Sequence, residues 1–277
     1  MATARKNELY ISGGAAIALG HSAVEAAQGG YYYLNKTFQK VDWKDKVLAA
    51  CASKISIHPD APLPSGDSQT FETTRIQVSN ETTLGAARRL MEQGLRPLAL
   101  NFANGILPGG GFLHGATAQE EALCRSSALY ETLRDDPMYQ AHKKRSLPDS
   151  SDWAIYSPDV PVFREDDGTE LSQPYLLSFI TCAAPYAPTV GQPLSGDLLE
   201  TRIQRVLAIA HAYGYTTLVL GAWGCGAFAN DPKRTAMDFR KALETTFAGK
   251  FSDVVFAITD WSPHRKFLKP FQDVFTE

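Results

Sequence analysis

Short apolar runs alternate with amphipathic stretches along most of the chain. The strand-like runs lie at residues 74–80, 96–102, 153–163, 175–185, 216–220 and 253–260. Segments with helical periodicity lie at 81–94, 118–134, 196–214 and 232–247. This alternation predicts a three-layer α/β/α domain with a mixed sheet. The run 96–102, RPLALNF, is almost entirely apolar and indicates a central strand, whereas two prolines in 153–163 favour a sheet edge.

The first 70 residues do not follow this alternation. Near their start, Arg5 and Lys6 precede a run of small apolar residues, as in a secretory signal peptide. Acidic residues and a histidine interrupt the run, so the segment predicts an ordinary amphipathic helix. We expect a mainly helical extension over 1–70, packed on a single core over 71–277. The polar, proline-punctuated stretch 135–152 is expected to be a surface excursion.

Composition narrows the class of protein. With 277 residues and 44% hydrophobic content, the chain can bury a sizeable core. A net charge of −3 argues against nucleic-acid binding by broad phosphate neutralisation. The cysteines are widely spaced and form no CxxC pair, which is typical of reduced thiols in a cytoplasmic or nuclear protein. No apolar run approaches the length of a transmembrane helix, so a soluble protein is expected.

The stretch with the most candidate functional residues is 101–133, NFANGILPGGGFLHGATAQEEALCRSSALYETL. An apolar strand runs into three glycines, and after seven further residues Gln-Glu-Glu opens a helical pattern. The carboxyl ends of strands in open α/β sheets bind ligands, and helix N-termini attract anions. Because glycine has no side chain, three consecutive glycines let the backbone approach a phosphate-rich ligand. The spacing matches neither the GxGxxG nor the P-loop pattern, and a mobile connector is the alternative interpretation of the glycines.

The two adjacent carboxylates differ in how they can be explained locally. Thr117 and Glu120 have the spacing of a capping box, so Glu120 is either a helix cap or a ligand-binding group. Glu121 lies beyond the box and has no such local role. Neighbouring helical residues diverge by about 100°, so the pair cannot act on one atom as the usual acid and base of glycosidases.

A second glycine-rich loop, GAWGCGAF over 221–228, follows another apolar strand. Two such loops at strand ends can hold opposite sides of one pyrophosphate. Phe228 is placed to cover a ribose or a base, whereas Trp223 is expected to pack in the core. Cys225 has no histidine near it in sequence and is interpreted as a structural thiol.

Motifs of other hydrolase classes are missing from the sequence. The six histidines form no HxH or HExxH spacing, and no GxSxG elbow occurs. His114, in the first glycine loop, is expected to be exposed. The sequence therefore lacks the catalytic motifs of metal-dependent and serine hydrolases.

The triple glycine followed after seven residues by Gln-Glu-Glu resembles the signature of poly(ADP-ribose) glycohydrolases (PARGs). FAN, at 102–104, is similar to their ribose-binding asparagine segment, and GCGAF, at 224–228, resembles their diphosphate-binding loop. IYSPDVPVFRED and ITCAAP look like the compact microbial branch, whose fold is a macrodomain with an N-terminal helical extension. The resemblance covers roughly residues 70 to 270, and only AVEAAQGGYYY matches loosely before that.

The resemblance implies a role for each matching residue. Glu121 would be the catalytic acid, Glu120 would bind hydroxyls of the ribose at the scissile bond, and Asn104 would help to hold that ribose. The substrate-binding residues that it implies are Asn104, Gly109, Gly110, Gly111, Phe112, Gln119, Gly224, Cys225, Gly226, Ala227 and Phe228. The family releases ADP-ribose from the free end of the polymer without metal or cofactor.

Elementary chemistry agrees with these roles. Cleavage of a ribose–ribose bond passes through an oxocarbenium-like transition state and needs a protonated leaving group and a positioned water. One glutamate can give the proton and, once ionised, activate the water. We expect a monomer that binds poly(ADP-ribose) and ADP-ribose, has ADP-ribosylated proteins as substrates, and binds neither nucleic acid nor membrane. The alternatives are a mono-ADP-ribosyl or O-acyl-ADP-ribose hydrolase, against which the intact Gln-Glu-Glu argues, and a non-catalytic ADP-ribose-binding macrodomain.

Overall fold

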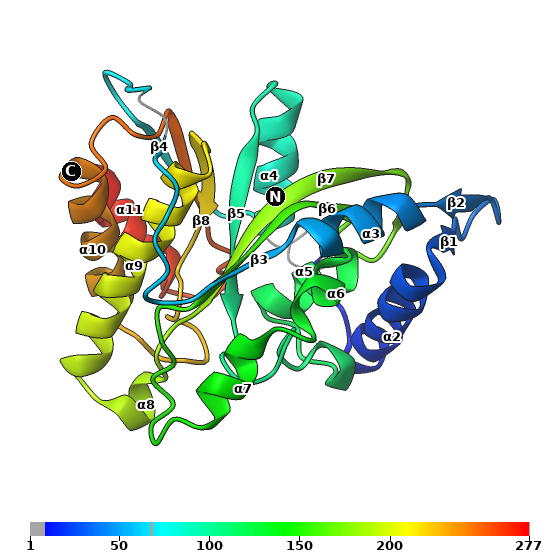
Figure 1. Ribbon diagram of the computed structural model, residues 1–277, viewed down its shortest axis with the longest axis horizontal. Helices are drawn as coiled ribbons and strands as arrows, with labels where there is room; N and C mark the ends of the chain where they lie inside the picture. The colour runs from blue at the N-terminus through cyan, green and yellow to red at the C-terminus, as the bar shows by residue number, and fades with distance from the viewer. Residues whose placement is uncertain (1–8, 67–68, 277) are drawn as a thin grey trace.

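The computed structural model describes residues 9–66 and 69–276, which fold as helices on both faces of a seven-stranded sheet (Figure 1). In spatial order the strands are β3 (Ile55–Ile57), β6 (Ala154–Arg164), β7 (Glu170–Ala183), β5 (Pro97–Ala103), β8 (Thr217–Leu220), β9 (Asp253–Ala257) and β4 (Arg75–Ser79). The pairs from β7 to β4 are parallel, and the two pairs that involve β6 are antiparallel. This mixed α/β/α arrangement confirms the predicted fold class, with β5 at the centre.

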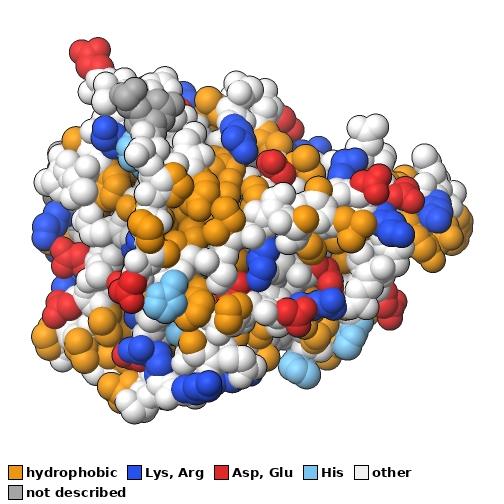
Figure 2. Space-filling model, in the orientation of Figure 1, with side chains coloured by type: hydrophobic (Ala, Val, Ile, Leu, Met, Phe, Trp, Pro, Cys, Tyr) orange, Lys and Arg blue, Asp and Glu red, His pale blue; other side chains and the backbone are white. Residues whose placement is uncertain are grey.

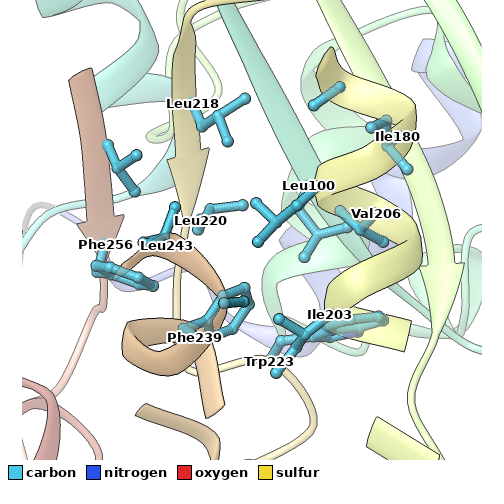
Figure 3. Close-up of a cluster of buried hydrophobic side chains, with 14 of the residues drawn as sticks. Leu100, Ile180, Ile203, Val206, Leu218, Leu220, Trp223, Phe239, Leu243 and Phe256 are labelled. Carbon is cyan, nitrogen blue, oxygen red and sulfur yellow. The ribbon is translucent and has the colours of Figure 1, made fainter. Parts of the chain in front are cut away.

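Each face of the sheet has its own hydrophobic cluster. One face packs against α9 (Leu194–Ala212), α10 (Pro232–Glu244) and α11 (Leu268–Thr276). In Figure 3, Leu220 of β8 lies beside Leu243 of α10, and Leu218 and Phe239 belong to the same cluster. The opposite face packs against α2 (Gly13–Gly29), α3 (Lys44–Ser53), α4 (Thr83–Glu92), α5 (Gln119–Ser126) and α6 (Leu129–Leu133).

The N-terminal residues pack on the domain and add a strand to its sheet. After α2 come a hairpin, β1 (Tyr31–Tyr33) with β2 (Lys40–Asp42), then α3 and β3, which pairs with β6. A Cβ at Gly20 of α2 would stand 2.7 Å from the backbone oxygen of Phe112, so α2 packs closely on the first glycine loop. Arg5 and Lys6 lie outside the described residues. No helix within 9–66 or 69–276 is long and apolar enough to cross a membrane.

The helix predicted over 118–134 is wrong in one respect, because it is two helices. Between α5 and α6, Ser127 is extended, forms a β-bridge with Val162, and donates its hydroxyl to the carbonyl of Leu123 at 2.7 Å. The next amide, of Ala128, donates to the carbonyl of Pro161. Contact with β6 therefore overrides a continuous helical pattern.

Two further predictions need correction. The strand at 153–163 is not an edge, since β3 pairs with residues 154–156. Its prolines lie beyond that pairing, where it pairs with β7 and, among the described strands, with no other. The excursion 135–152 contains α7 (Pro137–Lys143), whose Met138, Tyr139 and His142 side chains are buried. The helices α3 and α11 were also not predicted.

Candidate active site

A pocket of about 600 Å³ opens where β5, β8 and β9 end. Its wall includes the end of β5, the first turns of α4 and α5, the second glycine loop and part of the segment after β9. The lining residues used below are Thr82, Asn104, Gln119, Glu120, Glu121, Arg125, Asp166, Gly224, Gly226, Ala227, Phe228, Ile258, Thr259 and Phe267. The structure thus brings both glutamates, Asn104 and the second glycine loop to one cavity.

Gln119, the first residue of α5, fastens the helix to the sheet. Pairing of β5 with β7 runs on to Ala103, but its pairing with β8 ends at Ala99. Beyond that point the Gln119 amide takes the place of a strand: Oε1 accepts from Phe102 N at 2.9 Å, and Nε2 donates to Leu100 O at 2.7 Å. Its polar atoms are thus occupied within the protein, and its contribution is to aim the glutamates that follow.

Glu120 points into the protein rather than back along its own helix. Its side chain is 3% exposed; Oε2 accepts the amide of Asn104 at 2.7 Å, and Oε1 lies 3.4 Å from Asn101 Nδ2. The residue before α5 is Ala118, without a side-chain cap, so the capping-box interpretation with Thr117 is wrong. Burial raises the pKa of Glu120 to about 8, opposed by the Asn104 amide and reinforced by the charge of Glu121.

Glu121 has one oxygen held and the other without a partner. Oε1 accepts the amide of Gly111 at 2.9 Å, whereas Oε2 is buried and has no hydrogen bond among the residues that the structure describes. A buried polar atom without a partner is costly, by about 1–3 kcal/mol. The Oε2 atom is therefore suited to receive a polar group of a ligand.

Asn104 supports the site through its backbone and its side chain. Its amide donates to Glu120, and Oδ1 accepts the amides of Ile106 and Leu107, each at 3.0 Å. This turn fixes the loop immediately after β5. The Nδ2 group makes no hydrogen bond within the described part of the chain, and Asn104 lines the pocket, so it can donate to a ligand.

The first glycine loop lies behind the glutamates. Gly109 and Gly110 have φ of 71° and 59°, which only glycine adopts without strain. Phe112 is 1% exposed and packs against Tyr130, with ring centroids 4.9 Å apart. In this structure the loop packs against the carboxyls of Glu120 and Glu121, the acid pair. Neither its three glycines nor Phe112 lines the pocket.

The second glycine loop does face the pocket. Gly226 and Ala227 are exposed, and Phe228 stands edge-on to Tyr186 with ring centroids 5.7 Å apart. Gly224 has a φ of 75°, a left-handed conformation that favours glycine. The described residues offer no hydrogen-bond partner to the amides of 226–228, and consecutive amides of this kind form a concave anion site.

Cys225 and Trp223 turn inward from the same loop. Both are buried, at 2% and 0% exposure. Burial raises the pKa of the Cys225 thiol to about 12, which leaves it unreactive near neutral pH. The core position expected for Trp223 and the structural role expected for Cys225 agree with this placement.

Several pocket residues were not identified from the sequence. Arg125 lies one turn after Glu121 and is 4% exposed; it donates to the carbonyl of Ala116 at 2.8 Å. Asp166 comes from the β6–β7 turn and accepts the hydroxyl of Thr82 at 2.5 Å. Burial raises the pKa of Asp166. Only the spacing of four residues between Glu121 and Arg125 was a usable signal, because it puts both on one helix face.

The donor atoms do not form an obvious metal site. No three His, Cys, Asp or Glu side chains gather in metal-binding geometry within 9–66 and 69–276. On the face shown in Figure 2, Lys and Arg of the described residues are spread among Asp and Glu and form no continuous basic surface. The amides of residues 226–228, which have no partner among the described residues, are thus candidate anion-binding groups of the pocket.

Comparison with known proteins identifies similar chains. The family model of the microbial-type PARG catalytic domain matches residues 21–165. A search of curated proteins gave no match. The structure of a PARG from Thermomonospora curvata is 40% identical, covers 94% of this chain and 99% of that chain, and superposes with a TM-score of 0.89.

Two liganded structures are also similar. The T. curvata protein bound to the inhibitor ADP-HPD is 41% identical, covering 93% of this chain and 98% of that one, with a TM-score of 0.86. A Deinococcus radiodurans PARG in complex with ADP-ribose is 38% identical, covering 85% of this chain and 98% of that one, with a TM-score of 0.77.

Proposed function

This chain belongs to the microbial-type poly(ADP-ribose) glycohydrolases, and from that premise we propose that it releases ADP-ribose from the free end of poly(ADP-ribose), with Glu121 as general acid. It is a hydrolase of the ribose–ribose bonds in that polymer. ADP-ribosylated proteins would carry the substrate, and ADP-ribose would be the product.

The unpaired Oε2 of Glu121 is the observation that carries the assignment. The acid must meet the leaving oxygen of the glycosidic bond, so one carboxyl oxygen has to be free of hydrogen bonds to the protein. Oε1 is held by the amide of Gly111, which fixes the carboxyl plane, while Oε2 has no partner in the described protein. Both oxygens of Glu120 accept from asparagines, which fixes this carboxyl at the pocket wall, and we assign it to the hydroxyls of the ribose.

Proton supply follows from the burial of the pair. Burial raises the pKa of Glu120 to about 8, so this carboxyl keeps a proton near neutral pH. In this proposal Glu121 gives a proton to the leaving oxygen. The ionised Glu121 can then take a proton from the attacking water.

The diphosphate would lie on the second glycine loop. The amides of Gly226, Ala227 and Phe228 have no partner among the described residues and border the pocket. They supply directed donors without requiring a lysine or arginine. The ring of Phe228 would then cover the adjoining ribose or base. The Deinococcus relative was solved in complex with ADP-ribose, which supports ADP-ribose as the ligand of this pocket.

Removal from the free end is supported by the wall after β9. Ile258, Thr259 and Phe267 border the pocket two strands away from β5. Asp260 stiffens this segment, because it is 2% exposed and its Oδ2 accepts the amides of Phe267 and Leu268 at 2.7 and 3.1 Å. We place the adenosine end of the terminal unit against this wall, so a polymer that continued beyond that end would collide with it.

The test is digestion of end-labelled, chain-length-resolved poly(ADP-ribose). We expect ADP-ribose as the early product, while the remaining polymer shortens gradually. Early appearance of short oligomers would contradict release from the free end. Absence of polymer hydrolysis, with intact ADP-ribose binding, would instead indicate a non-catalytic macrodomain.

A further inference from the structure

His142 is buried outside the pocket, yet it holds the backbone next to Asn104. It lies on α7 and is 4% exposed. Nδ1 is 3.0 Å from the carbonyl oxygen of Gly105, and Nε2 is 2.7 Å from Ser151 Oγ and 3.2 Å from Ser151 N. Both ring nitrogens are thus engaged, one by the loop after β5 and one by the segment after α7.

These partners determine where the proton of the neutral ring must be. A carbonyl oxygen only accepts, so Nδ1 carries the hydrogen. Nε2 must then accept, which suits the amide and the hydroxyl of Ser151. Burial lowers the pKa of His142; the Gly105 carbonyl opposes this, Arg202 and Arg145 add to it, and Asp149 opposes it. The ring is therefore neutral near neutral pH, in one tautomer.

Gly105 is enclosed by the same contacts. A Cβ at this position would collide with Ser150 Oγ and stand 3.2 Å from the Ala183 Cβ and 3.3 Å from His142 Nδ1. The opposite wall is itself fixed, because Arg202, 1% exposed, donates to the carbonyls of Ala183 and Asp149. The loop after β5 is therefore held from outside the pocket by residues of the 135–152 segment and α9.

We propose that His142 is a positioning residue for the reaction: it holds the Gly105 carbonyl so that the Asn104 amide stays aimed at Glu120. The chain of contacts is short, since Gly105 adjoins Asn104, whose amide donates to Glu120 Oε2 at 2.7 Å. The inference rests on the proposed roles of Glu120 and Asn104. It assigns a function to the segment that the sequence indicates only as a surface excursion.

Two amide substitutions at His142 distinguish the hydrogen bond of Nδ1 from those of Nε2. The asparagine amide nitrogen can occupy the place of Nδ1, whereas the glutamine side chain reaches the place of Nε2. His142→Asn keeps the donor to Gly105, and His142→Gln keeps a group facing Ser151 but loses that donor. Ser151→Ala is the matched control on the other side of the ring.

The measurement is steady-state hydrolysis of the polymer, at a temperature where melting curves show each variant folded. We expect kcat within about 3-fold of wild type for His142→Asn and Ser151→Ala, and a fall of about 10- to 100-fold for His142→Gln, because small misplacements of reacting groups are costly. KM should change less than kcat, since the diphosphate loop is unaffected. Equal losses in both His142 variants, or no loss in His142→Gln, would overturn the proposal.

A second measurement needs no variant. In wild-type protein with ¹⁵N-labelled histidine, His142 should show a protonated Nδ1 and an unprotonated Nε2 near neutral pH, with and without ADP-ribose. The opposite tautomer, or a ring averaging between the two, would overturn the proposal. Wild-type turnover in Glu120→Gln would instead remove the role given to Glu120, whereas an impaired Glu120→Gln beside an unaffected His142→Gln would remove only that of His142.

Discussion

Gly110 lies directly against the carboxylate of Glu121. A Cβ at position 110 would overlap Oε1 of Glu121 and stand 2.9 Å from Oε2 of Glu120, and φ is 59°. The glycine is therefore required by the acid pair itself, as well as by its backbone conformation. Substituting it would disturb the carboxyls even with no ligand present, so a loss of binding in such a variant would not locate the diphosphate.

Gly226 is the better probe of the diphosphate position. It is exposed, borders the pocket, and a Cβ there would meet no atom within 4 Å. We expect Gly226→Val to keep the melting temperature of the wild type but to weaken ADP-ribose binding at least about 10-fold, since a branched side chain blocks backbone approach. Calorimetry with ADP-ribose measures this. Gly29→Val, at an exposed helical position with only ordinary contacts, is the control.

The companion variant Gly110→Val should behave differently from Gly226→Val. We expect a lower melting temperature, by several degrees, together with weaker binding and turnover, because both the left-handed backbone and the carboxylate contacts oppose a side chain. Wild-type binding by a folded Gly226→Val would contradict the placement of the diphosphate. A fully stable Gly110→Val would contradict the packing of the acid pair.

Only some of the pocket residues could be predicted from the sequence, for physical reasons. Glu121 could be singled out because no local role accounts for it, whereas the spacing of Thr117 and Glu120 suggested a cap that tertiary contacts with Asn104 replace. The role of Gln119 depends on where β5 and β8 part, which no local pattern encodes. Asp166 reaches the pocket from a turn distant in sequence.

The strands and most helices were predictable because their apolar faces repeat with a clear period. The break at Ser127 was not, since it depends on a bridge to Val162. The burial of α7 was hidden by its polar flanks, although Met138, Tyr139 and His142 lie on one side of it. In each case a contact distant in sequence outweighed a local preference.

Stability should depend on pH through Glu120. Its pKa is raised by burial from 4.5 to about 8, so the folded state binds a proton that the unfolded state has already released between these values. Stability from this group is present below about pH 4.5 and is lost as pH rises to about 8. The free energy of unfolding of wild type minus that of Glu120→Gln should fall over this range. Urea titrations measure it, and a constant or rising difference would contradict the burial of an ionisable Glu120.

Activity should survive chelation. No three His, Cys, Asp or Glu side chains of the described residues are grouped so that they could hold a metal ion, and the proposed acid and water-activating group are the same glutamate. We expect polymer hydrolysis in excess EDTA at the rate seen without it. Loss of activity that added Mg²⁺ restores would point to a metal-dependent ADP-ribosylhydrolase mechanism.

The last ADP-ribose on a modified protein should remain. The acid must meet a ribose–ribose oxygen, with Glu120 and Asn104 holding the ribose, whereas a serine or glutamate side chain offers a different leaving atom. Since a misplacement of about 1 Å can cost around 10²-fold, the protein linkage needs no separate barrier. Gel analysis of a protein carrying labelled polymer, digested to completion, should show one labelled unit per site. Complete release of label would indicate a mono-ADP-ribosylhydrolase.

The most direct test of the catalytic assignment compares hydrolysis and binding in Glu121→Gln. The substitution is nearly isosteric and removes the acid while leaving the diphosphate loop intact, so kcat should fall toward the upper end of about 10²- to 10⁴-fold. The affinity for ADP-ribose measured by calorimetry should stay close to that of wild type. Glu120→Gln should also lose turnover, but through weaker ribose positioning. Turnover of Glu121→Gln within a few-fold of wild type would contradict the account.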